Sequence, residues 1–413
     1  MKTVLKLIYN FLVLPLLWLY SKIMLLTNDK IRDRESKKDS YLDIPKKKGK
    51  RILIHASSMG EYEQVKYFVE LIKKNEPDTE IIASFFSPSG YNNLTNQKHF
   101  DYKVYSPIDF RARAKKFVNH IEPDIVFIVR YDLWYNFLSQ LNKNKTPIHL
   151  INTIFTISPT MGKSYIGKSF YKMMISKIST IYCVNKYHEE KFEKLNLSVP
   201  VKILPDTRYD RILSKVQEAE KIELLDIGDD YTTLVVGSCW KQDIIIITEV
   251  VKKLKQNHKL KVIYAPHEID TKTISQITDN VDSALLYSEM DVKQTGDNDI
   301  IIDKIGLLLT LYKYADIAYV GGAFGAGIHS VTEPAGYGVP IICGDKYFKT
   351  SEDARQLVKS GGLITIGNNK ELMTTLTTLL TESDKSKELG KANKKYIEEH
   401  CGSSKILYDE VVR

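Results

Sequence analysis

The feature that most constrains the fold of this chain is a regular alternation of short apolar runs with longer amphipathic segments, which begins after Lys50. The runs are rich in β-branched residues, and the segments between them have the spacing of one apolar helix face. An alternation of this kind predicts a parallel α/β sheet. The predicted strands of this half are residues 51–56, 80–85, 124–129, 147–152 and 180–185.

The same alternation restarts after a polar stretch that runs from about Pro205 to Asp230. The second set of predicted strands is 232–238, 261–266, 283–288, 299–303, 316–322, 340–344 and 363–366. Two doubly wound halves are expected, and such halves facing each other leave a ligand-binding cleft at the carboxyl ends of both sheets. The predicted parts are an apolar segment (1–27), a basic linker (28–50), a first domain (51–205), an interdomain linker (206–230), a second domain (231–384) and a C-terminal helical segment (385–413) that can pack back on the first domain.

The apolar segment at the start of the chain carries no charged residue between Leu7 and Ser21. A spanning helix needs about 20 apolar residues, and Lys6 and Lys22 can extend the usable length by directing their ammonium groups to the interface. No small-residue cleavage site follows, so a secretory signal peptide is not expected. With Trp18 as an interfacial anchor, the segment predicts a helix that spans the bilayer or lies in its surface. A helix buried in the protein is the alternative.

Charge and cysteine content narrow the environment. Lys and Arg number 59 against 51 Asp and Glu, a formal net charge of +8, and basic residues are dense over 30–51. Each basic residue near an anionic leaflet contributes ~1 kcal/mol to membrane binding. These residues therefore predict attachment to the cytoplasmic face of the membrane. Nucleic-acid binding is not expected, because no recognition motif accompanies these residues. The separated cysteines favour a reducing compartment over a disulfide scaffold; they are Cys183, Cys239, Cys343 and Cys401.

Small residues followed by a carboxylate come directly after the first predicted strand. Ser57, Ser58 and Gly60 allow the backbone to turn tightly into a helix, and Glu61 then falls in the first helical turn, over the predicted cleft. A carboxylate in that place can deprotonate an acceptor hydroxyl within hydrogen-bond reach. The alternative is a glutamate that only complements the helix dipole.

Two further segments place charged side chains at predicted strand ends. The strand 124–129 runs out at Arg130 and Asp132, which are expected at the carboxyl edge of the sheet, with a buried ion pair as their alternative role. Arg208, between the halves, can form a bidentate contact with a phosphate. Its alternative is a salt bridge with a neighbouring aspartate.

In the second half, glycines and polar residues follow the predicted strands. Ser238 lies at one strand end, and the glycine-rich stretch 321–344 allows close backbone approach. Backbone N–H groups at a helix start there can hold phosphate or an acidic sugar, and Glu333 can accept hydrogen bonds from ribose hydroxyls. The stretch is not a Walker loop, because no Gly-Lys-Ser/Thr follows the glycines.

No metal or cofactor is expected. The triplet Asp297-Asn298-Asp299 resembles a metal-binding D-x-D, but it precedes a strand in a polar loop, and such triplets are frequent by chance. The histidines have no zinc-ligand spacing.

Taken together, these motifs resemble the 3-deoxy-D-manno-octulosonic acid (Kdo) transferases of lipopolysaccharide assembly. The resemblance covers essentially the whole chain, beginning with the apolar anchor. The motifs that carry it are HASSMGE (55–61), FSPSGY (86–91), RYDLWYN (130–136), DTRYDR (206–211), GSCW (237–240), APHE (265–268), DKIG (303–306) and GIHSVTEP (327–334).

The resemblance implies the GT-B glycosyltransferase architecture of two facing Rossmann-like domains, and an inverting, metal-independent transfer of Kdo from CMP-Kdo to the lipid A precursor at the inner leaflet of the cell inner membrane. By motif position, Glu61 takes the place of the general base and Arg208 that of a cation at the transition state. The residues implied to hold the cytidine nucleotide are Pro266, His267, Ile305, Gly306, Leu307, Ser330, Val331, Thr332 and Glu333.

Two departures from the family pattern are present. Many members have Glu-Thr-Glu-Leu-Trp-Pro-Asn where this chain has residues 130–136, so Arg130 replaces a glutamate assigned a transition-state role. A cation there can hold the Kdo carboxylate or an acceptor phosphate instead. The usual His-Asn pair is His329-Ser330 here.

Two other functions are compatible with these motifs. One is a different GT-B glycosyltransferase or a sugar-nucleotide epimerase that uses a UDP donor, since the same fold serves both. The other is a non-catalytic membrane-binding scaffold, which would account for the basic surface and the anchor alone.

Overall fold

The computed structural model describes residues 2–95, 99–156, 164–219, 222, 230–290, 298–325 and 327–413. The chain divides into two compact units, Met1–Arg211 with Gly402–Arg413, and Ile212–Cys401. The predicted linker 206–230 lies partly outside the described residues, and its first part belongs to helix α11, Arg208–Glu218. The predicted domain boundaries stay predictions.

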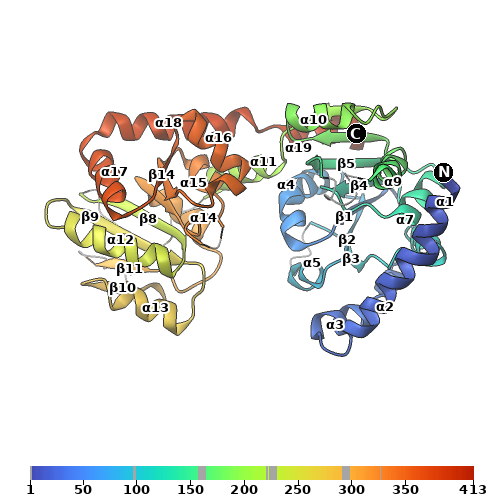
Figure 1. Ribbon diagram of the computed structural model, residues 1–413, viewed down its shortest axis with the longest axis horizontal. Helices are drawn as coiled ribbons and strands as arrows, with labels where there is room; N and C mark the ends of the chain where they lie inside the picture. The colour runs from blue at the N-terminus through green and yellow to red at the C-terminus, as the bar shows by residue number, and fades with distance from the viewer. Residues whose placement is uncertain are drawn as a thin grey trace. The chain divides into compact units, whose positions relative to one another are not determined.

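The described residues of the first unit form a seven-stranded parallel sheet in the order β3-β2-β1-β4-β5-β6-β7 (Figure 1). The strands are β1 Arg51–Ala56, β2 Glu80–Phe85, β3 Tyr102–Tyr105, β4 Ile125–Val129, β5 Ile148–Thr153, β6 Thr180–Cys183 and β7 Val201–Ile203. The predicted strands are confirmed. The edge strands β3 and β7 were not predicted, because both are short and β7 is largely exposed.

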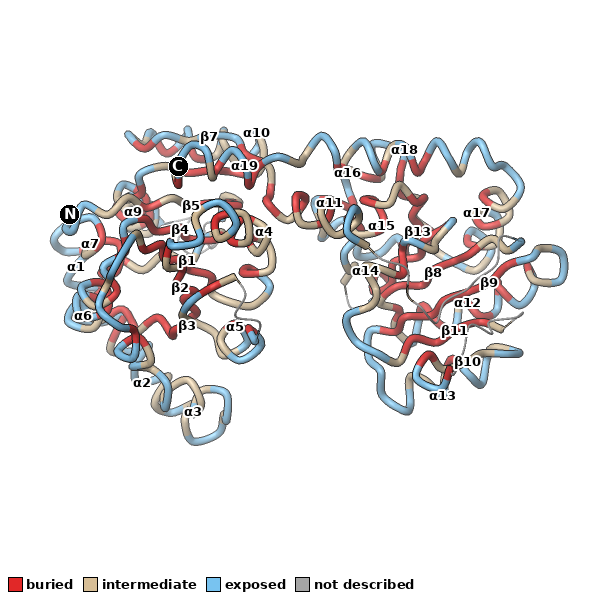
Figure 2. Tube along the Cα trace, turned by 180° about the vertical axis from the view of Figure 1, so that it is seen from behind, coloured by how far each residue is buried: buried red, intermediate tan, exposed pale blue. Residues whose placement is uncertain are grey.

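Both faces of this sheet are covered. Successive side chains of a strand point to opposite faces, and Ile52 and Ile54 of β1 belong to one apolar cluster while Leu53 belongs to the other. The helices of the unit include α4 Met59–Asn75, α5 Pro88–Asn93, α6 Arg111–Ile121, α7 Tyr135–Lys143, α9 Tyr165–Ile175 and α10 Lys186–Glu193. Figure 2 shows the buried residues concentrated in the strands.

The apolar segment forms a helix. Among the described residues, one helix, Lys2–Met24, is long and apolar enough to cross a membrane; it comprises α1 Lys2–Ile8, the π-helical turn η1 Tyr9–Val13 and α2 Leu14–Met24. Leu5, Tyr9 and Leu14 are buried against the first unit, whereas Phe11 is 76% exposed. The helix therefore docks by a narrow stripe and presents most of its apolar surface outward. Helix α3, Asp29–Ser36, follows, and then the turn η2, Ser40–Asp43.

The described residues of the second unit form another seven-stranded parallel sheet, in the order β10-β11-β9-β8-β12-β13-β14. The strands are β8 Thr232–Cys239, β9 Leu260–Pro266, β10 Ala284–Leu286, β11 Asp299–Ile301, β12 Ile317–Val320, β13 Ile341–Gly344 and β14 Leu363–Ile366. The helices include α12 Lys241–Leu254, α13 Thr271–Thr278, α14 Leu308–Leu311, α15 Thr332–Tyr337, α16 Glu352–Ser360, α17 Asn369–Thr381 and α18 Ser383–Glu399. The doubly wound α/β fold predicted for both halves is confirmed.

The last residues of the chain return to the first unit. Helix α19, Ser403–Leu407, and the turn η6, Tyr408–Val412, pack against α4. Asp210 accepts hydrogen bonds from the backbone N–H groups of Gly402 and Ser404, the latter at 2.7 Å. Glu410 accepts one from the Tyr182 hydroxyl at 3.0 Å. The segment predicted as one piece, 385–413, is thus divided between the two units.

Candidate functional site

The strand order of each sheet defines where a ligand can sit. In the first unit the order reverses between β1 and β4, and in the second unit between β8 and β12. In doubly wound sheets, ligands bind outside the carboxyl ends of the strands at such a switch point. The segments that follow these strands are HASSMGE and RYDLWYN in the first unit, and GSCW and the glycine-rich stretch in the second. These four motifs therefore lie at the two switch points, whereas FSPSGY, DTRYDR, APHE and DKIG lie at or after the carboxyl ends of other strands.

Glu61 lies in the first turn of α4, directly after β1 and the turn at Ser57 and Ser58. It is 8% exposed, and its Oε2 accepts a hydrogen bond from the backbone N–H of Ser57. Gly60 does not enforce this turn sterically, because a Cβ built on it would approach Ser58 Oγ no closer than 4.0 Å. The turn instead holds one carboxylate oxygen of Glu61 by a backbone donor at the carboxyl edge of the sheet.

His55, near the end of β1, contacts one side chain of β2 and one of the segment that follows β4. Its Nδ1 lies 2.8 Å from Ser84 Oγ, and its Nε2 lies 3.0 Å from Asp132 Oδ2. The His55 side chain is fully buried, so it does not reach a ligand itself and acts only by orienting Asp132. Asp132 is positioned by this contact, and its sequence neighbour Arg130 adopts φ +67°.

Arg130 and Arg208 come together at one carboxylate. Asp206 Oδ2 lies 3.8 Å from an Arg130 Nη and 3.6 Å from Arg208 Nε, and Asp206 is buried. Arg130 also donates from Nε to Gln64 Oε1 at 2.8 Å. The structure therefore groups two cations that lie 78 residues apart, since 208 − 130 = 78. Arg208 pairs with Asp206, while Arg130 pairs with Asp206 rather than with Asp132.

The loop that carries Arg208 is fixed to the sheet by Thr207. Its hydroxyl donates to the Gln64 carbonyl at 2.7 Å, and its N–H donates to Asn152 Oδ1 at 3.1 Å. Asn152 lies in β5 with φ +51°. Sequence reasoning missed Gln64 and Asn152, because polar residues within a helix or strand carry no local signal of a distant partner.

Close backbone packing shapes the second switch point. A Cβ on Gly321 would lie 2.4 Å from the Ser238 carbonyl oxygen, and one on Gly322 would lie 2.2 Å from that of Gly327. Gly322 has φ +93° and Ser238 has φ +49°. Contacts this short exclude a side chain, so the two glycines are required where the loop after β12 crosses the end of β8.

A stack of three aromatic rings stands at this edge. The His267 ring stacks on both Trp240 and His329, with centroids 4.4 and 4.5 Å away, and the Trp240 and His329 rings lie nearly in one plane. Trp240 donates from its indole N–H to His329 Nε2 at 2.8 Å. Because an indole can only donate, Nε2 of His329 accepts and its proton resides on Nδ1. Burial, together with the neighbouring His267, lowers the pKa of His329.

Asp243 fixes both sides of this switch point through three hydrogen bonds. Its carboxylate accepts hydrogen bonds from the N–H of Trp240 at 2.8 Å, the N–H of Gly322 at 3.0 Å and the hydroxyl of Tyr319 at 2.8 Å. Burial raises the pKa of Asp243. Sequence reasoning missed this residue, although a carboxylate three residues after a strand-end Trp is a recognisable helix-capping signal.

The other residues singled out for nucleotide binding follow the carboxyl ends of β9, β11 and β12. Pro266 ends β9 and is buried, and His267 after it is exposed. Ile305 is 87% exposed, and Gly306 has φ +93°.

The start of α15 and the cap of α14 hold the remaining residues. Ser330 Oγ lies 3.1 Å from Thr332 Oγ1. Val331 and Thr332 are buried, and Glu333 is half-buried. Leu307 is half-buried at the cap of α14.

Metal ligation finds no support in the described part of the chain, which contains no group of three or more His, Cys, Asp or Glu side chains able to hold an ion. Of the D-x-D triplet, Asp297 lies outside the described residues. Asp299 is buried in β11 and pairs with Lys255 Nζ at 2.6 Å. Its carboxylate is therefore a structural partner of a lysine.

The chain is similar to known proteins. A family model described as 3-deoxy-D-manno-octulosonic-acid transferase (kdotransferase) matches residues 31–211. A bifunctional glycosyltransferase/methyltransferase of Fusobacterium nucleatum is 29% identical over 82% of the chain, and the match spans 54% of that protein, about half its length. A 3-deoxy-D-manno-octulosonic acid transferase of Rickettsia bellii is 25% identical over 92% of the chain and 91% of its own length.

Solved structures share the fold. A UDP-GlcNAc 2-epimerase from Neisseria meningitidis has a TM-score of 0.63 at 10% identity, covering 88% of this chain and 99% of that one. MurG from Acinetobacter baumannii has a TM-score of 0.54 at 12% identity, with coverage of 88% and 99%. The fold is thus of the GT-B type that these proteins share.

Proposed function

We propose that this chain, which belongs to the family of 3-deoxy-D-manno-octulosonic acid (Kdo) transferases, transfers Kdo from CMP-Kdo to the lipid A precursor, lipid IVA. The proposed transfer inverts the anomeric configuration and needs no metal ion. The observation that carries the proposal is the placement of Glu61: a carboxylate at the switch point of the first sheet, with one oxygen held by the Ser57 N–H.

Glu61 is the general base of the proposed reaction. Because Oε2 accepts the Ser57 N–H, Oε1 is the oxygen directed to the acceptor. It takes the proton of a glucosamine hydroxyl while that oxygen forms a bond to the anomeric carbon of Kdo. The bond from this carbon to the phosphate oxygen breaks, and CMP leaves with the bonding electrons. General-base catalysis contributes about 10²- to 10⁴-fold.

The cations Arg130 and Arg208 stabilise negative charge in this scheme. Asp206 holds both guanidinium groups at a common position, so little reorganisation is needed when charge develops on the leaving phosphate. Arg130 stands where many relatives carry glutamate. We assign it to the carboxylate of Kdo or to a phosphate of the acceptor, both of which suit a guanidinium fork.

The second unit binds the cytidine nucleotide in this proposal. The residues assigned to it are those that follow β9, β11 and β12, from Pro266 and His267 to the start of α15. Support comes from the fixed loop at Gly321 and Gly322 and from the aromatic stack at Trp240. Backbone N–H groups there suit a phosphate.

The acceptor is a lipid, and we place the enzyme at the cytoplasmic face of the inner membrane. The outward apolar surface of helix Lys2–Met24 supports this assignment, as do the basic residues that follow it.

The test is Glu61→Gln. Turnover of lipid IVA with a CMP-Kdo generating system, followed by mass spectrometry, is expected to fall by about 10²-fold or more, while CMP binding stays near that of the wild type. The matched control is Glu63→Gln, on the same helix, whose carboxylate pairs with Arg211. Wild-type turnover in the Glu61 variant, or equal losses in both variants, contradicts the assignment.

The rival with a UDP donor is favoured by one observation, the similarity of fold to a UDP-GlcNAc 2-epimerase. Thermal stabilisation separates the two: CMP but not UDP raises the unfolding temperature if the donor is CMP-Kdo. A scaffold without a nucleotide site responds to neither.

A further inference from the structure

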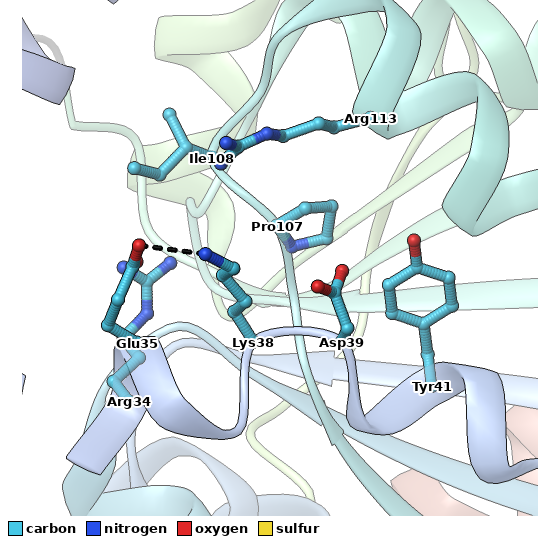
Figure 3. Close-up of a pocket in the computed structure, with 8 residues that line it drawn as sticks. All are labelled: Arg34, Glu35, Lys38, Asp39, Tyr41, Pro107, Ile108 and Arg113. Atoms are coloured by element: carbon cyan, nitrogen blue, oxygen red, sulfur yellow. Dashed lines mark hydrogen bonds and ion pairs between the residues drawn. The ribbon is translucent and has the colours of Figure 1, made fainter. Parts of the chain in front are cut away.

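A small cavity lies in the first unit, near the C-terminal end of the apolar helix Lys2–Met24. Its volume is about 70 Å³, several times the space that one water molecule needs and well below that of a site for a whole nucleotide. Its walls come from α3 and the turn after it, from the segment that follows β3, and from α6 (Figure 3). The lining residues are Arg34, Glu35, Lys38, Asp39, Tyr41, Pro107, Ile108 and Arg113.

The cavity carries more positive charge than its carboxylates offset. Among the described residues, no carboxylate lies within 4.0 Å of the guanidinium nitrogens of Arg34 or Arg113. Glu35 is shared between Lys38 at 2.9 Å and Lys22 at 2.7 Å. Figure 3 shows Lys38 and Arg113 reaching into the cavity from opposite walls, with Asp39 at the end beside Tyr41.

Arg34 is held in place but incompletely paired. One Nη donates to the Ser106 carbonyl at 3.2 Å, and the guanidinium carbon lies 4.2 Å from the centroid of the Phe86 ring. Its Nε is buried and makes no hydrogen bond among the described residues. A buried cation with an unused donor is costly, and a tetrahedral anion would satisfy it through the guanidinium fork.

The contact between Arg34 and Phe86 connects the cavity to the candidate active site. Phe86 follows β2, and its other neighbour is Trp134 of the RYDLWYN segment, with ring centroids 5.0 Å apart. Arg34 therefore stands between the apolar helix, through α3, and the carboxyl edge of the first sheet.

The position of the cavity indicates where its ligand comes from. Lys22 lies in the last turn of the apolar helix and pairs with Glu35 of the cavity, and Ile23 and Leu26 near it are exposed. If the outward apolar surface lies in a bilayer, basic side chains at its end fall at the level of the lipid phosphates. We propose that the cavity binds the phosphate group of an anionic membrane lipid through Arg34, Arg113 and Lys38. This site goes beyond the proposed glycosyl transfer and rests only on the proposed attachment to the membrane, which binding to phosphatidylcholine vesicles tests separately.

The experiment measures binding of the full-length protein to vesicles. One set contains phosphatidylcholine alone, and in the other part of it is replaced by phosphatidic acid. Arg34→Gln and Arg113→Gln are each expected to weaken binding to the phosphatidic acid vesicles by about tenfold, the scale of a lost hydrogen-bonded charge contact, with binding to phosphatidylcholine unchanged. Arg32→Gln is the matched control, because it removes the same charge from α3 while its own partners, Asp29 and the carbonyls of Leu25 and Leu26, do not line the cavity.

Three outcomes overturn the proposal. The first is a loss in Arg32→Gln as large as that in Arg34→Gln, which would reduce the effect to net charge. The second is wild-type binding of both cavity variants to phosphatidic acid vesicles, with circular dichroism confirming that they fold. The third is stabilisation against heat by glycerol 3-phosphate as strong as that by a monomeric short-chain phosphatidic acid, which would make the ligand a soluble phosphate. The lipid assignment is supported when only the lipid-borne phosphate gives the larger stabilisation and both cavity variants lose it.

Discussion

At the scale of single residues, the hydrogen bond from Trp240 to His329 depends on the neutral state of His329. The ring accepts the Trp240 N–H at Nε2, and protonation of that nitrogen would remove the acceptor. Burial, then the neighbouring His267, lowers the pKa of His329. The folded protein therefore resists a proton that the unfolded chain takes up near the ordinary histidine pKa of about 6.5.

This asymmetry predicts a pH dependence of stability. As the pH falls below about 6.5, the unfolded chain binds the proton first, so the free energy of unfolding decreases. His329→Gln retains an acceptor for Trp240 but does not titrate, and we expect its unfolding temperature to decline less over the same range in scanning calorimetry. His258→Gln, after α12, serves as the control. An unchanged pH profile in the His329 variant would refute this role.

At the scale of elements, the apolar helix is joined to the first unit by a polar contact as well as by its buried stripe. The Tyr9 hydroxyl donates to Asp109 Oδ2 at 2.9 Å, and the same carboxylate accepts the N–H groups of Asn136 and Phe137 at the start of α7. Burial raises the pKa of Asp109 to about 7. Asp109 thus couples the position of the helix to that of α7, whose preceding residues carry Asp132 and Trp134.

Removing the tyrosine hydroxyl should loosen this element. Tyr9→Phe is expected to lower the free energy of unfolding by about 1 kcal/mol, because Asp109 loses a buried donor. Tyr20→Phe is the matched control on the same helix, since Tyr20 is 61% exposed. Chemical denaturation compares the two, and equal stability of both variants would show that the contact contributes nothing.

At the scale of the whole molecule, each unit contributes a distinct part of the proposed enzyme: the first holds Glu61 and the cations, and the second holds the nucleotide loop. In this proposal the apolar helix gives the enzyme access to a lipid acceptor. Deleting residues 1–27 is an ambiguous test of that role, because Leu5, Tyr9 and Leu14 belong to the core of the first unit.

Substitutions confined to the outward face are a cleaner test. The triple change Phe11→Gln, Leu12→Gln and Leu16→Gln leaves the buried stripe intact and removes exposed apolar side chains. Since burying each such side chain contributes about 1.5–3 kcal/mol, we expect activity on membrane-embedded acceptor to fall by at least about tenfold. Activity on detergent-dispersed acceptor should change little. Equal losses on both acceptors would exclude membrane anchoring through this face.

The central strands, the helices between them and the place of Glu61 could be predicted from local patterns, because apolar periodicity and the residues that follow a strand are local signals. The edge strands β3 and β7 escaped, since short, partly exposed strands lack that periodicity. For the candidate site, the sequence indicated the strand-end segments but not the contacts among them.

Which side chains meet depends on the three-dimensional packing of the elements. Packing pairs Arg130 and Arg208 with Asp206, joins Trp240 to His329, brings Asp243 to the N–H groups of Trp240 and Gly322, and places Arg34 in the wall of a cavity. Those contacts join positions far apart in the chain, and a side chain's own neighbours do not reveal them. Packing of the elements brings such groups within hydrogen-bond reach, and only then does each acquire its charge, its orientation and its partner.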